Sequence, residues 1–292
     1  TLSEPGESDE FTFAGWAGQR LVFDGLAGAY NAQLVRLYAP SGAEVPGFLY
    51  YNYGTGADSA PFTLRETGTY RLVVDGVGST TGDYAFRLID VAAAPAQALN
   101  LDESRNASLD PGASAQVYRF DGTAGQRIYV DVLSPTSDYT GSWYLYDPND
   151  QQILGGSYIR SNYDGEVVLP SSGRYVLVFF GNAASAVEYS FQVVTPTASS
   201  TAMPLGSTVT ATLSEPGEAD EYTFAGSAGQ RLVFDGLLGD GNFQPRLYAP
   251  SGVEVPGFLY AGYGTGADSA PFTLREAGTY RLVVDGVGST TG

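Results

Sequence analysis

Three residue types are missing from the 292-residue sequence: cysteine, histidine and lysine, since all 14 basic residues are arginine. Without cysteine the chain has no disulfide, no thiolate metal site and no cysteine nucleophile. Without histidine it lacks a Ser-His-Asp triad and imidazole metal ligands. Without lysine it forms no Schiff base and no Lys-Asn isopeptide crosslink. The remaining chemistry is that of carboxylate, tyrosine and serine groups and of metals bound by oxygen.

Positive charge is also scarce. The chain has 32 acidic and 14 basic residues, a formal net charge of −18, and the acidic residues are spread along its whole length. Such a surface disfavours nucleic acid and anionic membranes as partners. The sequence has no run of about 18 apolar residues, so we expect no insertion into a membrane.

What the sequence does contain is an internal repeat. Residues 1–26, TLSEPGESDEFTFAGWAGQRLVFDGL, return almost unchanged at 212–237, and the match continues to Gly292, the counterpart of Gly82. A divergent copy lies between them and repeats the same frame, for example in SGRYVLVFFG at 172–181. Self-similarity at this spacing is typical of tandem domains.

We therefore predict three domains in A-B-A order, named here the first, middle and third repeat. The predicted boundaries are 1–92 for the first repeat, 93–98 for a linker, 99–195 for the middle repeat, 196–204 for a second linker and 205–292 for the third repeat. Both linkers are rich in small and polar residues and proline.

The two ends of the chain fall at different points of the repeat. The third repeat begins with LGSTVTA (205–211), a candidate strand that the first repeat lacks, and the first repeat continues into DYAFRLID (83–90), a candidate strand that the third repeat lacks. This phase predicts a window of a longer tandem array, the alternative being an arbitrary boundary. Each missing strand predicts an open sheet edge that recruits a pairing partner.

The local patterns predict β-structure throughout. Apolar and polar residues alternate in segments such as EYTFAG, TYRLVVDG and DYAFRLID, which places Phe11 and Phe13 on one core-facing side of their strand. Six Asp-Gly pairs predict tight turns, at Asp24, Asp75, Asp121, Asp164, Asp235 and Asp285. The predicted fold class is all-β, with three tandem antiparallel β-sandwiches of jelly-roll type.

The repeated frame resembles a known family. PG, then DE(F/Y)TF-AG, AGQRL, RLYAPSG, GTYRLVVDG and TGDYAFRL is similar to the bacterial pre-peptidase C-terminal domain. The resemblance implies a β-sandwich that is appended to secreted peptidases or repeated in large surface proteins, and for some members it implies binding of calcium and extracellular polymers. The middle repeat departs from the frame, because ASAQVYRF (113–120) lacks the acidic residues of ESDEFTF.

Calcium is the cofactor that this composition allows. Three acidic residues crowd the start of a predicted strand in each near-identical repeat: Glu7, Asp9 and Glu10, and their counterparts Glu218, Asp220 and Glu221. Crowded carboxylates repel one another unless a divalent cation neutralises them. The alternative is that these side chains face water while the neighbouring aromatic residues face the core.

These observations predict a non-catalytic structural segment of an extracellular adhesin or cell-surface filament, whose partners are neighbouring copies of itself. The alternative is a carbohydrate- or protein-binding accessory module of a secreted hydrolase, with extracellular polysaccharide or protein as partner. Tyrosine-rich stretches at 48–56, 137–146 and 157–165 favour the alternative, since tyrosine stacks on sugars and makes protein contacts.

Overall fold

The computed structural model is all-β, as the sequence predicts. It describes residues 1–28, 32–45, 48–49, 54–93, 96–133, 140–159, 167–183, 185–239, 241–259 and 264–292. Within these residues, strands are joined by turns and irregular chain, and the single helical element is a 3₁₀ turn, Gly54–Gly56. No helix in the described part of the chain is long and apolar enough to cross a membrane.

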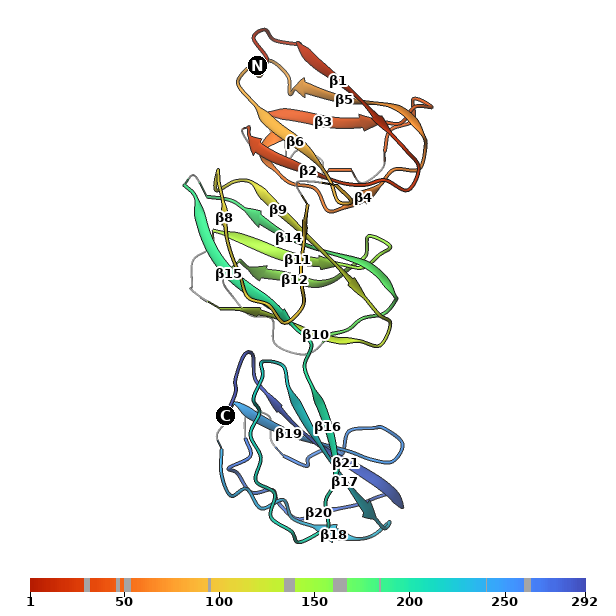
Figure 1. Ribbon diagram of the computed structural model, residues 1–292, viewed down its shortest axis with the longest axis vertical. Coiled ribbons are helices and arrows are strands. Elements are labelled where there is room, and N and C mark those ends of the chain that lie inside the picture. Colours follow the sequence, from red (N-terminus) through yellow and green to blue (C-terminus); the bar gives the residue numbers. More distant parts are fainter. Residues whose placement is uncertain are drawn as a thin grey trace. The chain divides into compact units, whose positions relative to one another are not determined.

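The first repeat forms two sheets that enclose a core (Figure 1). One sheet has the order β1 (Ser8–Gly15), β5 (Gly68–Gly76), β3 (Gln33–Tyr38), and the other has the order β4 (Phe62–Thr63), β2 (Arg20–Ala27), β6 (Ala85–Asp90). Side chains alternate across the strands, so Leu21 and Phe23 of β2 face this core. Phe13 stacks on Tyr70 with 5.5 Å between ring centroids, as the predicted strand face requires.

The middle repeat has the larger sheets. The first has the order β12 (Gln152–Tyr158), β11 (Gly141–Tyr146), β14 (Gly173–Gly181), β9 (Ala115–Gly122), β7 (Gln97–Ala98). The second contains β13 (Val167–Val168), β10 (Arg127–Val132), β15 (Val187–Val194) and β8 (Arg105–Leu109). Buried aromatic side chains from both sheets fill the space between them, among them Tyr118, Phe179 and Phe191.

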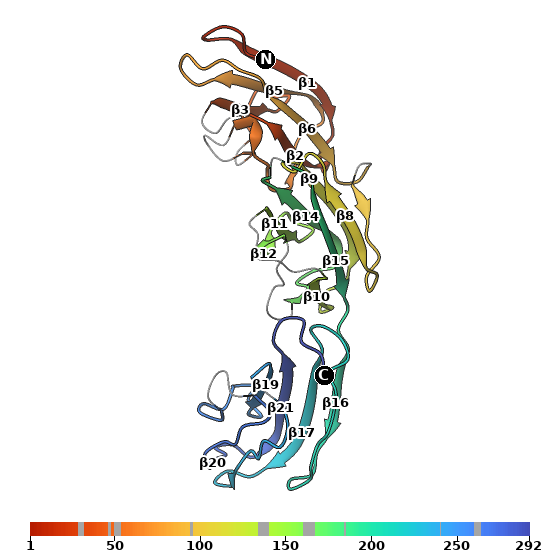
Figure 2. The same ribbon diagram turned by 90° about the vertical axis from the view of Figure 1, so that its left-hand side faces the viewer.

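The third repeat repeats one sheet of the first and adds a strand to it. The sheet order is β16 (Ala198–Ala202), β17 (Ala219–Gly226), β21 (Gly278–Gly286), β19 (Phe243–Tyr248), and Figure 2 shows β16, β17 and β21 side by side. Its second sheet is reduced, among the described residues, to β18 (Arg231–Leu232) paired with β20 (Phe272–Thr273).

Two strand pairs are parallel, which the sequence patterns did not indicate. β7 runs parallel to β9, and β16 runs parallel to β17. Both added strands come from stretches expected to be linkers, so each connecting segment contributes hydrogen bonds to the repeat that follows it. This pairing gives the connecting chain a fixed course where the sequence suggested a tether.

The Asp-Gly pairs do not form the predicted tight turns. Asp24 and Gly25 lie inside β2, where a Cβ atom on Gly25 would be 2.4 Å from the carbonyl oxygen of Ala57. The glycine is needed because the neighbouring backbone approaches too closely for a side chain. Other described pairs lie at strand ends or in irregular chain, at Asp75, Asp121, Asp285 and Asp235. The pair at Asp164 falls outside the described residues.

The strand predicted at 205–211 is also absent: these residues are irregular and exposed. In the middle repeat the corresponding strand, β8, pairs with β15. The third repeat has no counterpart of β15 among the described residues, so the backbone of 205–211 has no strand to pair with. A period-2 pattern forms a strand where a partner strand is present.

By the density of contacts the chain forms two compact units. One contains residues 1–126, 132–161 and 169–192, and the other contains 127–131, 162–168 and 193–292. The first repeat and most of the middle repeat therefore belong to one unit. The division into three domains at the stated boundaries stays a prediction.

Candidate functional site

A buried apolar cluster joins the first repeat to the middle repeat; we call it the junction. Its side chains come from β2, β6, β9, β11, β14 and the connecting segment: Val22, Ile89, Val91, Ala96, Ala115, Val117, Tyr146, Val176 and Val178. Val22 is fully buried, although it points away from the core that Leu21 and Phe23 fill. Strands β2 and β14 are thus apolar on both faces, as strands covered on both sides are.

An arginine ties one edge of the junction. Arg20 of β2 forms an ion pair with Asp150, whose carboxylate also accepts a hydrogen bond from Thr63. The same guanidinium donates to the carbonyl oxygens of Asp147 at 2.7 Å and Arg174 at 3.2 Å. Since a planar guanidinium holds several acceptors at once, Arg20 fixes the first repeat on the loop that follows β11.

A buried carboxylate ties the opposite part of the junction. Asp24 is fully buried, accepts a hydrogen bond of 2.8 Å from the Ala115 amide and forms an ion pair with Arg87. Arg87 in turn donates to the Ala115 carbonyl oxygen at 3.1 Å. Backbone and side chains of the two repeats therefore satisfy one another in a region closed to water.

Asp24 lies beside a second carboxylate, Asp58, which accepts a hydrogen bond of 2.8 Å from the Gly25 amide. Burial raises the pKa of Asp24, against the lowering effect of the Ala115 amide and Arg87. Burial also raises the pKa of Asp58 well above its ordinary value, and the charge of Asp24 adds to that rise. The junction thus contains a pair of carboxyl groups that bind protons more readily than exposed ones.

The connecting segment is held by one side chain. Arg119 of β9 donates to three backbone carbonyl oxygens, of Val91 at 2.8 Å, Ala93 at 3.1 Å and Ala96 at 3.1 Å. Three charge-assisted hydrogen bonds to one short stretch restrict its backbone. The first and middle repeats are thus connected by chain that is itself bonded to the middle repeat.

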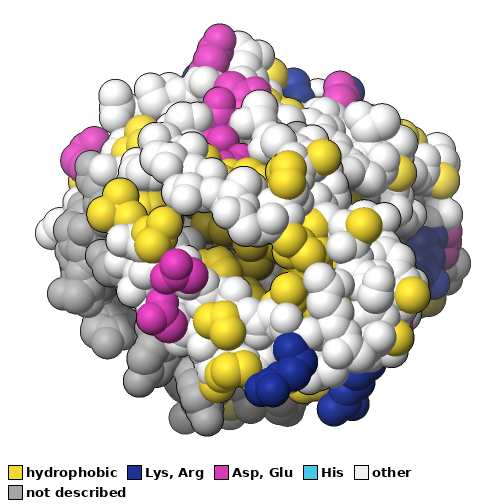
Figure 3. All heavy atoms as spheres, turned by 90° about the horizontal axis from the view of Figure 1, so that it is seen from below, with side chains coloured by type: hydrophobic (Ala, Val, Ile, Leu, Met, Phe, Trp, Pro, Cys, Tyr) yellow, Lys and Arg dark blue, Asp and Glu magenta, His cyan; other side chains and the backbone are white. Residues whose placement is uncertain are grey.

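The same face of the third repeat is open. Val233, the counterpart of Val22, is 56% exposed, and the counterparts of Arg20 and Asp24, Arg231 and Asp235, are exposed as well. Figure 3 views the molecule from the end where Figure 1 places β18 and β20, and hydrophobic side chains surround a hollow there. One sequence pattern therefore occurs once covered and once uncovered.

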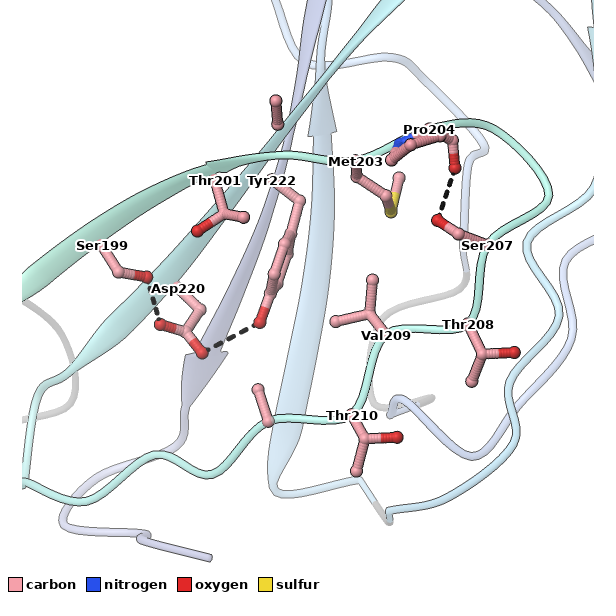
Figure 4. A pocket seen from close by; sticks show the side chains of 12 residues that line it. Ser199, Thr201, Met203, Pro204, Ser207, Thr208, Val209, Thr210, Asp220 and Tyr222 are labelled. Atoms are coloured by element: carbon pink, nitrogen blue, oxygen red, sulfur yellow. Dashed lines mark hydrogen bonds between the residues drawn. The ribbon is translucent and has the colours of Figure 1, made fainter.

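A surface pocket of about 460 Å³ lies in the third repeat (Figure 4). It is lined by β16, β17 and the irregular residues after them: Ser199, Thr201, Ala202, Met203, Pro204, Ser207, Thr208, Val209, Thr210, Ala211, Asp220 and Tyr222. Asp220 accepts hydrogen bonds from Ser199 at 2.6 Å and from Tyr222 at 3.0 Å. Burial, together with the bond to Asp220, raises the pKa of Tyr222 to about 12, so its hydroxyl is neutral.

A second, smaller pocket of about 220 Å³ lies at the rim of the junction. Trp16, Arg20, Pro148 and Arg174 are among its lining residues, and the Trp16 side chain is 52% exposed. An exposed indole beside a polar hollow offers a flat surface to a ligand. Most of the tyrosine-rich stretches predicted to bind ligands lie outside the described residues, including 50–53, 134–139 and 160–166.

The calcium-site residues of the first repeat do not converge. Glu7 accepts hydrogen bonds from the Ser3 and Glu4 amides, and these bonds, with Glu4 first, lower its pKa. Asp9 accepts a hydrogen bond from Tyr84, while Glu10 lies 3.0 Å from Arg71 in an ion pair. Neighbouring strand residues point to opposite faces, which separates Asp9 from Glu10.

The counterparts in the third repeat behave in the same way. Glu218 accepts hydrogen bonds from Ser214 and from the Glu215 amide, Asp220 faces the pocket, and Glu221 pairs with Arg281 at 2.7 Å. In the part of the chain that is described, no three acidic residues are grouped as metal ligands would be. The six residues do not fit a shared calcium site in this structure, and calcium binding stays a prediction.

Comparisons with known proteins give low similarity. No family model matches the sequence, and no curated protein matches it. Among solved structures, PliG from Aeromonas hydrophila, a periplasmic lysozyme inhibitor of g-type lysozyme, is 18% identical over 34% of this chain and 93% of that chain, with a TM-score of 0.28.

Two other solved structures are similar at the same level. The pre-peptidase C-terminal domain of a collagenase from Bacillus anthracis is 20% identical over 34% of this chain and 93% of that chain, with a TM-score of 0.27. PliG from Salmonella Typhimurium is 24% identical over 33% and 96%, with a TM-score of 0.25. At these values the matches carry no argument about activity or partners.

Proposed function

We propose that the chain is a non-catalytic structural segment of an extracellular adhesin or cell-surface filament, built from β-sandwich repeats that support one another through fixed junctions. The observation that carries this proposal is the junction of the first and middle repeats. Its apolar centre, the Arg20 contacts and the buried Asp24 make the two repeats a single packed body. A structural element needs this kind of junction, because a flexible tether transmits no bending load.

Composition supports the rest of the proposal. The missing cysteine, histidine and lysine leave few catalytic arrangements, and the net charge of −18 suits a solvated surface in an extracellular setting. The resemblance of the repeated frame to pre-peptidase C-terminal domains supports a place outside the cell. We assign the self-association of neighbouring repeats, rather than a reaction, as the central property.

The experiment that tests this role is force spectroscopy on the whole chain, pulled from its two ends. We expect the first and middle repeats to resist extension together, in one unfolding event rather than two of independent size. Val22→Asp, which places a charge in the junction, should divide that event. Separate, unchanged events in the unaltered chain would contradict a load-bearing junction, and labelling of intact producing cells with an antibody would test the surface location.

The second candidate function is a carbohydrate- or protein-binding accessory module of a secreted hydrolase. The pocket beside Trp16 favours it, because an exposed indole is suited to stacking on a sugar ring. A glycan array probed with the chain and with Trp16→Ala tests this candidate. The third repeat carries Ser227 at the same position, so Ser227→Trp should create a second binding position if the indole alone decides binding.

A further inference from the structure

The first and third repeats differ in one strand. In the first repeat β6 pairs with β2 along its length, from Leu21 with Asp90 to Ala27 with Ala85. The third repeat follows the same course as far as Gly292, since Leu213 and Gly292 exchange backbone hydrogen bonds as Leu2 and Gly82 do. Beyond that point no described residue takes the place of β6.

The strand that β6 would pair with is open. Residues 233–238 of the third repeat are irregular, whereas their counterparts in the first repeat belong to β2. Leu237 is 63% exposed and Leu238 is 80% exposed. Exposed backbone and apolar side chains at a sheet edge form a template for another strand.

The pocket in Figure 4 lies at the inner side of the missing strand. In the first repeat the counterpart of Tyr222 is Phe11, which meets the rings of Tyr84 and Phe86 at 6.4 Å and 5.3 Å between centroids. In the first repeat Asp9, the counterpart of Asp220, accepts the hydroxyl of Tyr84. The pocket residues are thus those that the aromatic side chains of a last strand contact.

The middle repeat shows the same contacts independently. Its residue at this position, Tyr118, has its hydroxyl 3.0 Å from that of Tyr189 and its ring 5.0 Å from that of Phe191. Tyr189 and Phe191 belong to β15 and are spaced two apart, like Tyr84 and Phe86. Two of the three repeats therefore fill this position with a Tyr-x-Phe strand.

Charge agrees with the aromatic pattern. Arg87, three residues after Tyr84, forms the ion pair with the buried Asp24. The counterpart of Asp24, Asp235, is exposed and has no ion pair within the described part of the chain. A strand with the sequence of 83–91 would bring the missing arginine to it.

We propose that the third repeat binds an extended strand with the sequence Asp83–Val91, supplied by another copy of the repeat, which pairs with residues 231–237 and places its tyrosine and phenylalanine against Tyr222. Main-chain hydrogen bonds give such a complex its affinity, and alternate side chains fix the register. The bound strand also supplies counterparts of Ile89 and Val91, which complete the apolar face that the middle repeat covers in the first repeat. This inference deepens the proposed structural role and rests on it for its biological meaning.

A fluorescein-labelled peptide of residues 82–91, GDYAFRLIDV, tests the proposal when it is titrated into the 292-residue chain. We expect saturable binding by anisotropy, and we expect hydrogen exchange of the amides of residues 231–238 to slow. The amides of 20–27 are the internal control, because β6 already pairs with them. Replacing the peptide's Tyr84 and Phe86 by serine should weaken binding by at least about tenfold.

A second chain carries residues 83–91 joined directly after Gly292. Its amides at 231–238 should exchange slowly without added peptide, and it should no longer bind the labelled peptide. Slowing in this chain supports the proposal even where the free peptide binds weakly, since connection raises the effective concentration.

The proposal is wrong if 231–238 exchange at the same rate in all samples, or if the serine peptide binds as well as the original. Association of the unaltered chain that the peptide reverses supports a second copy as the donor. None of these measurements depends on the junction, so a failure here leaves the force experiment to decide the proposed function.

Discussion

The first and third repeats have almost the same sequence and different surroundings. Val22 is fully buried in the junction, while Val233 is 56% exposed. Asp24 is buried and bonded to Arg87 and Ala115, while Asp235 is exposed. The strand around Val22 has eight residues, and the matching strand β18 has two.

This difference shows that strand length here depends on non-local partners. The residues of β2 and 231–238 share their propensity and alternation, yet only the copy that has β6 beside it and the middle repeat over it forms the full strand. Propensity for β-structure largely expresses packing against neighbours. Matched substitutions in the two repeats can separate local from non-local effects.

The largest expected effect comes from a charge in the junction. Val22→Asp should lower the free energy of unfolding by about 3–5 kcal/mol, since it buries a carboxylate without a partner. Val233→Asp, on the open face, should change it by less than about 0.5 kcal/mol. Urea unfolding, with hydrogen exchange of β2 and β14 to locate the change, measures both. Equal effects of the two substitutions would contradict the difference in burial.

Arg20→Ala should have the next largest effect. It leaves Asp150 and two backbone carbonyl oxygens without their donor, which should cost about 1.5–3 kcal/mol. Arg231→Ala is the control and should cost less than about 0.5 kcal/mol, because Arg231 is exposed. A cost for Arg231→Ala that matches Arg20→Ala would show that the open face is covered in solution.

Where the two repeats make the same contact, matched substitutions should have equal effects. Tyr70 donates a 3.0 Å hydrogen bond to the Glu66 carbonyl oxygen, and Tyr280 does the same to Glu276. Tyr70→Phe and Tyr280→Phe should each cost about 1 kcal/mol in the free energy of unfolding. Thermal unfolding of the two single variants measures this, and a cost confined to one repeat would mean that these cores differ.

Acidity should distinguish the junction by a smaller amount. The pKa values of Asp24 and Asp58 are raised, so the folded chain takes up protons at a pH where the unfolded chain does not. The contribution of this pair to the free energy of unfolding should therefore rise as the pH falls from neutrality through the raised values. It should level off below the ordinary aspartate value of 3.8.

Asp58→Asn removes one of these proton-binding groups and keeps an oxygen that can accept the Gly25 amide. We expect its free energy of unfolding to rise less than that of the unaltered chain between pH 7 and pH 4. Arg87, which stays charged throughout, is the nearest cation to both groups. Urea titrations at several pH values check the difference, and identical profiles would remove the carboxyl pair as its cause.

Calcium should have the smallest effect. If Glu7, Asp9 and Glu10 bind it, a chelator should lower the melting temperature of the first repeat and leave the middle repeat unchanged. Each of these carboxylates already has a separate protein partner, so a bound ion would have to displace Arg71 or Tyr84. Calorimetry with and without chelator decides this, and an unchanged melting curve would contradict calcium binding.

The sequence predicted the fold class but not the junction. Alternation was enough to place Phe13 and Tyr70 in a core, because each strand carries its own signal. The runs LVF in β2 and YVLVFF in β14 are apolar on both faces, and this was the available sign that a second layer covers them. Nothing in the run itself could say that Val22 is covered and Val233 is open, since both copies have the same residues there.

The candidate calcium site failed to converge for a related reason. Spacing along the chain placed Glu7, Asp9 and Glu10 together, but a strand sends alternate side chains to opposite faces, and arginine and tyrosine partners came from β5 and the segment before β6. The Asp-Gly pairs misled the turn prediction because the glycine at Gly25 answers to a neighbouring backbone rather than to a turn. Both errors arise from contacts between residues far apart in sequence.

The junction joins two unlike faces, and this affects how a gene for such a protein can lengthen. Duplicating one repeat alone would place two faces of the same kind against each other, with two copies of Arg20 and no copy of Asp150 between them. Duplicating a first and a middle repeat together preserves every contact. Recombination that adds or removes whole pairs is therefore tolerated, and the near-identity of residues 1–26 with 212–237 is the pattern that such an exchange leaves.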